Sequence, residues 1–272
     1  MRSDQINLSV AALEARFGIV SKELATCPDH GDYAAIYSKR HEGPSGCPMC
    51  AEVRQREQDK IDQLAQRDKF ATEALQRKLG SALIPYRFKD RSFDGYTATS
   101  PQQVKALSVC REYAENFQSH YDAGRCLLLL GNAGTGKTHL AAAIANHIML
   151  NSAATAVYRT LGGILQYIKG SYDKATDYSE AEAFAGLITP SLLIIDEIGA
   201  TKPTEFELAS LFQIINGRYE QQLPTIVISN LPSKDLPGAM GDRCVDRLRE
   251  CGGIAVGFDW QSARSTQKGA AK

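Results

Sequence analysis

Residues 126–138, CLLLLGNAGTGKT, decide the fold of this chain. The first five residues form an unbroken apolar run, which is typical of a strand buried on both faces of a parallel sheet. Residues 131–138 then follow the pattern G-x-x-x-x-G-K-T, and residues 139–150 are an alanine-rich segment with helical character. The order of strand, glycine-rich loop and helix predicts an α/β fold with a loop that binds phosphate.

This loop has the chemistry that a nucleoside triphosphate requires. Its glycines let backbone N–H groups close on the phosphates, and the N-terminus of the following helix adds a positive dipole. Lys137 would bring a positive charge to the β- and γ-phosphates, and the hydroxyl of Thr138 would bind Mg²⁺. The residues expected to bind ATP are Gly131, Asn132, Ala133, Gly134, Thr135, Gly136, Lys137 and Thr138.

A pair of acids follows a second apolar run. Residues 192–195, LLII, lead directly into Asp196 and Glu197. An acid at the carboxyl end of a buried strand faces the ligand crevice of an open α/β sheet. We expect Asp196 to hold Mg²⁺ through its water shell and Glu197 to polarise the attacking water, which predicts ATP hydrolysis. The alternative is a solvated pair of charges at the end of a strand.

A third apolar run, residues 225–229, ends in Asn230. An amide at the end of a neighbouring strand would orient the water molecule against the γ-phosphate, which makes Asn230 a candidate catalytic residue. Asparagine also commonly begins loops, so the same residue fits a purely structural role.

Four potential metal ligands lie near the beginning of the chain, as Cys27 and His30 and then Cys47 and Cys50. The C-x-x-H and C-x-x-C spacings let tight turns place both pairs on one tetrahedral zinc ion. All four coordination positions are then filled, so the site would be structural. Reduced cysteines without a metal are the alternative, and His41 is a second candidate for the histidine ligand.

Differences in residue composition along the sequence predict three parts of the chain. Residues 1–50 form a small zinc-binding module, and residues 51–84 form a charged linker helix. Residues 85–272 form the ATPase domain. Residues 51–79 contain neither glycine nor proline and carry charge on most faces of the expected helix. This helix is either a solvated spacer or a helix that binds a partner.

Composition excludes several classes of protein. The charges of the 31 basic and 31 acidic residues cancel. This excludes a strongly basic protein that coats nucleic acid and an acidic disordered tail as descriptions of the whole chain. No apolar run reaches the ~18 residues of a membrane-spanning helix, and residues 1–5 lead into no signal peptide. Seven cysteines without a secretion signal argue against a disulfide framework. We therefore expect a cytoplasmic protein with no membrane partner.

The motifs together resemble the DnaC family of replicative helicase loaders and its IstB-like relatives, within the AAA+ ATPases. The resemblance covers roughly residues 85–264. The motifs that carry it are Arg87-Phe88, SFDGY at 92–96, the phosphate loop, LIIDEIG at 193–199, Ser229-Asn230, GDRCVDRLR at 241–249 and FDWQSAR at 258–264.

The resemblance implies an AAA+ core with a parallel sheet flanked by helices, which self-associates through the ATPase domain. It implies loading of a DnaB-type replicative helicase onto single-stranded DNA during replication initiation. The zinc-binding module resembles knuckles on phage- and prophage-encoded loaders, where the N-terminal region meets the helicase. A zinc-bearing N-terminal module therefore favours a replication loader over a transposition protein.

The same resemblance assigns roles to single residues. Asn230 would be sensor 1 and Arg264 would be sensor 2. Arg247 would be the arginine finger that completes the ATP site of a neighbouring subunit, with Arg243 close by. A permanently charged guanidinium suits the charge that develops on the phosphates. Without the resemblance, Arg243 and Arg247 also fit a solvated helix face.

Residues between the nucleotide motifs are candidates for contact with DNA. Basic groups follow phosphates and aromatic rings stack on bases. A surface helix is the alternative for this segment. The candidates are Arg159, Tyr167, Lys169 and Tyr172.

The sequence motifs are also compatible with two other functions. The first is an IstB-like transposition helper, which would share the ATP chemistry but remodel duplex DNA and recruit a transposase. The second is a nucleotide-binding adaptor without turnover, in which the zinc module makes the interaction.

Overall fold

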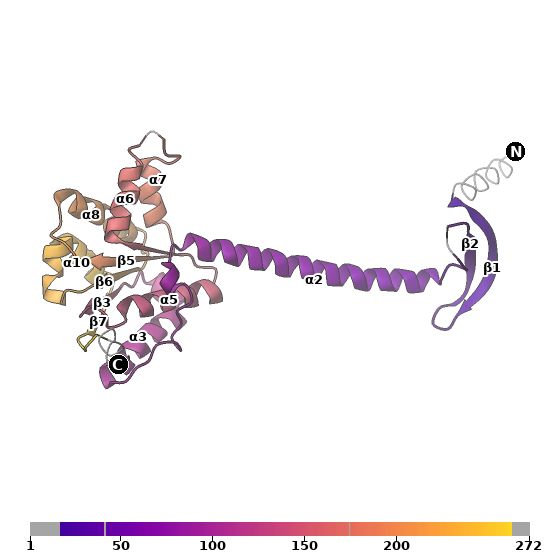
Figure 1. The fold of residues 1–272 in the computed structure, drawn as a ribbon, viewed down its shortest axis with the longest axis horizontal. Helices are drawn as coiled ribbons and strands as arrows, with labels where there is room; N and C mark the ends of the chain where they lie inside the picture. Colours follow the sequence, from indigo (N-terminus) through magenta and orange to yellow (C-terminus); the bar gives the residue numbers. More distant parts are fainter. Residues whose placement is uncertain (1–16, 41, 174, 263–272) are drawn as a thin grey trace, which may run out of the picture. The chain divides into compact units, whose positions relative to one another are not determined.

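The computed structural model describes residues 17–40, 42–173 and 175–262 (Figure 1). The chain divides into two compact units, Met1–Thr72 and Glu73–Lys272. The boundary falls inside one long helix, so we describe each unit by itself.

The smaller unit contains an antiparallel hairpin followed by the start of this helix. Strand β1 spans Ile19–Cys27 and strand β2 spans Gly31–Ser38, with Cys27 paired to Gly31 at the turn. Helix α2 spans Pro48–Ser81 and buries none of its residues. Between Pro48 at its first position and Gly80 near its end, the helix contains neither glycine nor proline, which explains why it continues for 34 residues without a break.

The larger unit is built on a parallel sheet of five strands in the order β4-β5-β6-β3-β7. This confirms the predicted AAA+ type of core, a parallel sheet flanked by helices (Figure 1). The strands are β3 (Leu127–Gly131), β4 (Ala156–Thr160), β5 (Leu192–Ile198), β6 (Thr225–Ser229) and β7 (Ile254–Phe258). The helices are α3 (Pro101–Glu115), α4 (Phe117–Asp122), α5 (Lys137–Asn151), α6 (Leu161–Gly170), α7 (Glu180–Ile188), α8 (Glu205–Glu220), α9 (Leu236–Met240) and α10 (Asp242–Glu250), with short 3₁₀ turns η1 (Tyr86–Phe88) and η2 (Ser233–Asp235).

Alternate residues of β3, β5 and β6 enter different cores. In β3, Leu127 and Leu129 join the core that includes residues of α3 and α5. Leu128 and Leu130 join the core that includes residues of α6, α7, α8, α9 and α10. Burial on both faces explains why β3, β5 and β6 are nearly continuous apolar runs, and it makes the unit a layered α/β/α structure.

The end of α2 packs with the larger unit. Lys78 donates from Nζ to the carbonyls of Met149, at 2.9 Å, and Ser152, at 2.6 Å, at the C-terminus of α5. Ala82 is fully buried, and its carbonyl accepts a hydrogen bond from the backbone of Tyr158 on edge strand β4. The last residues of the predicted linker, residues 51–84, therefore pack with the larger unit.

Within the described residues, none of the helices is both long and apolar enough to cross a membrane.

Candidate functional site

A pocket of about 330 Å³ lies where the carboxyl ends of β3, β5 and β6 meet. Ligands of open α/β sheets bind at this edge. The structure brings most of the sequence-predicted nucleotide residues into this one pocket. Its lining residues are Arg87, Phe88, Arg91, Ala133, Gly134, Gly136, Lys137, Thr138, His139, Asp196, Glu197, Ile228 and Asn230.

The phosphate loop connects β3 to α5, and Gly136 is the residue that precedes the helix. Gly136 has a φ of +99°, and a Cβ there would lie 2.5 Å from the ring of Tyr96. Only glycine fits both the left-handed backbone and the close ring. The loop therefore presents its backbone to the pocket at the N-terminus of α5, where phosphate groups bind.

Lys137 is buried at the base of this loop. Its Nζ donates to the carbonyls of Gly131 and Asn132, both at 2.7 Å, and to Oδ1 of Asn230 at 2.9 Å. The lysine thus joins the end of β3 to the end of β6. Its ammonium group lies in the pocket, where a point charge would meet the phosphates of a nucleotide.

Asp196 is held by donors from three directions. Its Oδ2 accepts from Thr138 Oγ1 at 2.8 Å and from the hydroxyl of Tyr158, and its Oδ1 accepts from the backbone of Glu197 at 2.6 Å. The hydroxyl and the carboxylate expected to hold Mg²⁺ are therefore direct neighbours. Oxygen ligands of this kind suit Mg²⁺, which keeps several of its waters in protein sites.

A bulge at the end of β5 gives the two acids different environments. Ile195 pairs with Val227 but Ile198 pairs with Ser229, so β5 contains one residue more than β6 over this stretch. Glu197 has a φ of +64°, which is uncommon for a residue other than glycine. As a result, Asp196 is buried while Glu197 is exposed in the pocket. Backbone strain of this kind is often found at functional sites.

Two aromatic residues hold the phosphate loop from outside. The Tyr96 hydroxyl and the Trp260 indole N–H both donate to the carbonyl of Thr135, at 3.1 Å each. Burial raises the pKa of Tyr96 to about 12, so this hydroxyl stays protonated and remains a donor. Both residues belong to motifs that carry the family resemblance, although the sequence assigned them no role.

The sequence also assigned no site role to five residues that line the pocket, one of which, Ile228, lies on β6. Arg87, Phe88 and Arg91 come from the segment before α3, and His139 follows Thr138 on α5. The His139 ring is 3.0 Å from the carbonyl of Ser92, which links the two segments. The sequence marks Arg87 and Phe88 only through the family resemblance. A local sequence pattern does not show that the turn they form lies beside the phosphate loop, which is distant along the chain.

The two predicted finger arginines lie outside the pocket of their own chain. Arg247 on α10 pairs with Glu250 at 2.8 Å, donates to Asn216 at 3.2 Å, and lies 4.3 Å from the ring centroid of Tyr219. Arg243 on the same helix lies over the ring of Phe212. The predicted sensor-2 residue Arg264 is outside the described residues.

The candidate DNA residues divide between half-buried and exposed positions. Arg159 lies 4.2 Å from the ring centroid of Tyr167, and Tyr167 stacks on Tyr178 at 4.8 Å. Burial lowers the pKa of Arg159 from its usual value. Lys169 and Tyr172 are exposed, on α6 and in the loop that follows it. The side chains of the exposed pair are therefore more accessible to a DNA strand than those of the half-buried pair.

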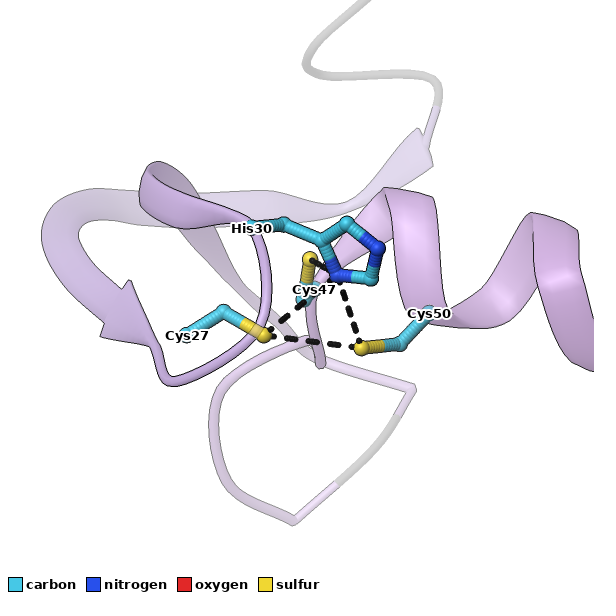
Figure 2. A group of neighbouring side chains, drawn as sticks. All are labelled: Cys27, His30, Cys47 and Cys50. Atoms are coloured by element: carbon cyan, nitrogen blue, oxygen red, sulfur yellow. Dashed lines mark hydrogen bonds between the residues drawn. The ribbon is translucent and has the colours of Figure 1, made fainter.

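The four predicted metal ligands come together in the smaller unit. Figure 2 shows Cys27 and His30 at the hairpin turn facing Cys47 and Cys50 at the start of α2. All four ligand atoms lie within 4.8 Å of one another. His41, the alternative ligand, is outside the described residues.

The distances within this cluster fit a tetrahedral metal site. His30 Nδ1 lies 3.6, 3.8 and 3.3 Å from the sulfurs of Cys27, Cys47 and Cys50, and the Cys27 and Cys50 sulfurs are 3.5 Å apart. A zinc ion with bonds of about 2.0–2.3 Å holds its ligand atoms roughly 3.3–3.8 Å apart. A disulfide would instead need sulfurs about 2.05 Å apart, and all seven cysteines are free.

Local hydrogen bonds favour a thiolate in this cluster. The backbone of Asp29, and then the His30 ring, lower the pKa of Cys27 to about 6. The neighbouring Cys27 raises the pKa of Cys50 to about 11. A thiolate is the form that binds metal ions.

Comparison with protein families identifies the family to which this chain belongs. Residues 55–249 match the family model described as IstB-like ATP binding protein. The chain belongs to this family. The matched region contains all of the pocket residues and most of α2.

Relatives of known name agree with this assignment. The chain is 31% identical over 195 residues to the "Replicative helicase loader DnaC" of Buchnera aphidicola subsp. Acyrthosiphon pisum, covering 72% of this chain and 78% of the relative. It is 30% identical over 215 residues to the protein of the same name from Escherichia coli K12, covering 79% and 86%. The predicted resemblance to DnaC-type proteins is thereby confirmed.

Solved structures share the fold. The crystal structure of the DnaC helicase loader matches with a TM-score of 0.56 at 22% identity, over 63% of this chain and 98% of that one. AMPPCP-bound DnaA from Aquifex aeolicus matches with a TM-score of 0.54 at 22% identity, over 67% and 53%. These similarities confirm the AAA+ fold, and the family assignment makes the chain an ATPase of that class.

Proposed function

We propose that this chain uses ATP to load a DnaB-type replicative helicase onto single-stranded DNA. The observation that carries the proposal is the match to the named helicase loaders, which spans most of both chains. The assembled pocket supports it, because a loader of this kind needs an ATP site and this chain has one. Such loading takes place in the bacterial cytoplasm, so we propose that location.

We assign the residues of the pocket as follows. Lys137 contacts the β- and γ-phosphates, and Asn230 orients the attacking water. Thr138 and Asp196 fit Mg²⁺, which would neutralise the phosphate charge. Glu197 takes up a proton from the water, because its exposed carboxylate lines the pocket, whereas the Asp196 carboxylate accepts three hydrogen bonds.

We propose that Arg247 acts on the ATP of a neighbouring subunit. Arg243, on the same helix, is the next candidate for this role. Two features support the role of Arg247. The side chain is partly exposed on α10, and its ion pair with Glu250 is a surface pair, which is easily exchanged for a stronger anion. The site would then be complete only in an assembly of several copies.

We propose that Cys27, His30, Cys47 and Cys50 hold a structural zinc ion. The donor set and its tetrahedral spacing support the assignment. The zinc module and α2 are the parts of the chain that we assign to helicase binding. Lys169 and Tyr172 are the residues that we assign to single-stranded DNA.

A second candidate function is that of a transposition helper. The family description supports it, because it names IstB-like ATP binding proteins. Pull-down experiments separate the two. The chain would be immobilised and offered the replicative helicase of its own bacterium and, separately, a transposase of the kind that IstB-like proteins serve. Retention of the helicase supports the loader, whereas retention of the transposase alone favours the alternative.

A further inference from the structure

Tyr158 on β4 is a buried residue of the larger unit that no sequence motif singles out. It pairs with Ile194 of β5, two residues before the level at which Thr160 pairs with Asp196. Its side chain belongs to the same core as Ile194 and residues of α5. A residue on the neighbouring strand, two positions away and on the same face, is within reach of an aromatic side chain. This explains how the Tyr158 hydroxyl reaches the Asp196 carboxylate.

The Asp196 carboxylate has two donors on one oxygen. Oδ2 accepts from the hydroxyls of Thr138 and Tyr158, while Oδ1 accepts from the backbone of Glu197. Thr138 has a second task in the proposed mechanism, because its oxygen is also a ligand of Mg²⁺. Tyr158 has no such second task, so it is the side-chain donor that can hold Oδ2 throughout the reaction.

We propose that Tyr158 is a positioning residue, which fixes the orientation of the Asp196 carboxylate so that Asp196 can hold the water shell of Mg²⁺. This inference rests on the proposed function, in which Asp196 and Thr138 hold the ion. Donors of this kind behind a metal ligand commonly fix its orientation, and their loss weakens metal binding.

The surroundings of Tyr158 keep this donor in place. The residue is 4% exposed, and its backbone N–H donates to the carbonyl of Ala82 at 2.8 Å, on the side of β4 away from β5. The strand is therefore bonded on both edges at this point. The donor is therefore fixed in position.

The test compares Tyr158→Phe with Tyr113→Phe. Tyr113 is also fully buried, and its hydroxyl donates to the carbonyl of Arg125 at 2.7 Å, away from the pocket. Each variant loses one buried phenol hydroxyl and keeps its ring. The affinity for ATP is measured by calorimetry on the full chain, once with Mg²⁺ and once with EDTA.

We expect Mg²⁺ to strengthen ATP binding about tenfold less in Tyr158→Phe than in the wild type. The affinity in EDTA should be unchanged, since Tyr158 is not among the residues that line the pocket. Tyr113→Phe should respond to Mg²⁺ as the wild type does. An equal response to Mg²⁺ in Tyr158→Phe and the wild type overturns the inference, as does the same loss in both variants.

Asp196→Asn separates this inference from the proposed function. If Asp196→Asn loses the response to Mg²⁺ and Tyr158→Phe keeps it, only the role of Tyr158 is wrong. If Asp196→Asn responds to Mg²⁺ as the wild type does, the assignment of Asp196 as a metal residue fails, and the role of Tyr158 fails with it.

Discussion

Glu197 is the residue whose role can be tested with the smallest change. It faces the pocket, while its neighbour Asp196 makes the hydrogen bonds that hold the site together. Glu197→Gln should keep ATP affinity near the wild-type value, because shape and packing are preserved. Turnover should fall by roughly 10²–10⁴-fold, the usual contribution of a general base. A steady-state ATPase assay and calorimetric ATP binding measure the two quantities.

Glu205→Gln is a matched control for this change. Glu205 is an exposed acid in the first turn of α8 and does not line the pocket. Its replacement should leave turnover unchanged. Normal hydrolysis in Glu197→Gln would show that another group activates the water.

Arg247 can be tested by mixing two inactive variants. Arg247→Ala should bind ATP normally but hydrolyse it about 10³-fold more slowly, since arginine fingers contribute at least that much. Lys137→Ala should fail in its own site yet keep an intact finger. A mixture of the two should regain partial ATPase activity, because some interfaces then join an intact pocket to an intact Arg247.

Arg249→Ala is the control on the same helix, since Arg249 is exposed two residues further on. It should hydrolyse ATP at the wild-type rate. Absence of rescue in a mixture that demonstrably co-assembles would exclude Arg247 as a finger in trans, and Arg243 would be tested next.

The cluster of four candidate zinc ligands leads to a prediction at the level of secondary structure. It joins the turn between β1 and β2 to the first turn of α2. Metal analysis of protein purified without chelators should find about one zinc ion per chain, as four filled positions imply. Cys47→Ser should weaken zinc retention and loosen the hairpin, as monitored by proteolysis. Cys251→Ala, in the larger unit, should retain zinc fully.

The ATPase core should survive loss of the ion. Its sheet and pocket belong to the unit Glu73–Lys272, whereas the four ligands belong to the other unit. ATP binding by Cys47→Ser should therefore equal that of the wild type. Protein without zinc, prepared free of chelators, contradicts the assignment of the cluster.

The sequence predicts some elements well for a physical reason. Strands β3, β5 and β6 are buried on both faces, so each is a short apolar run with a polar motif at its end. The carboxyl ends of parallel strands meet at one edge, which is why Lys137, Asp196 and Asn230 could be expected in a common site. The charged stretch of residues 51–79 was likewise predictable as a helix, because it lacks helix breakers.

Other features depend on contacts that a local pattern does not contain. The β1–β2 hairpin mixes charged and apolar residues, and its Leu24 is 80% exposed, so no regular alternation marks it. Strand β7 is short and contains a glycine. Tyr158 meets Asp196 only through the register between β4 and β5. These features follow from tertiary pairing, which residue spacing alone does not specify.

The whole molecule combines a pocket lined by phosphate-loop residues with a second unit that carries four candidate metal ligands. The two units share α2, whose last turns pack on the core through Lys78. This division suits a protein that holds a partner with one part and hydrolyses ATP with the other. We therefore propose that ATP use by the core serves the transfer of a helicase to DNA.

The most direct test measures how much replicative helicase becomes bound to single-stranded DNA circles coated with single-strand binding protein. With the chain and ATP present, we predict a clear increase in bound helicase over helicase alone. Lys137→Ala, which lacks the phosphate lysine, should give only the background level. If the wild-type chain binds ATP and the helicase but leaves the amount of helicase on DNA at background, the chain is not a helicase loader.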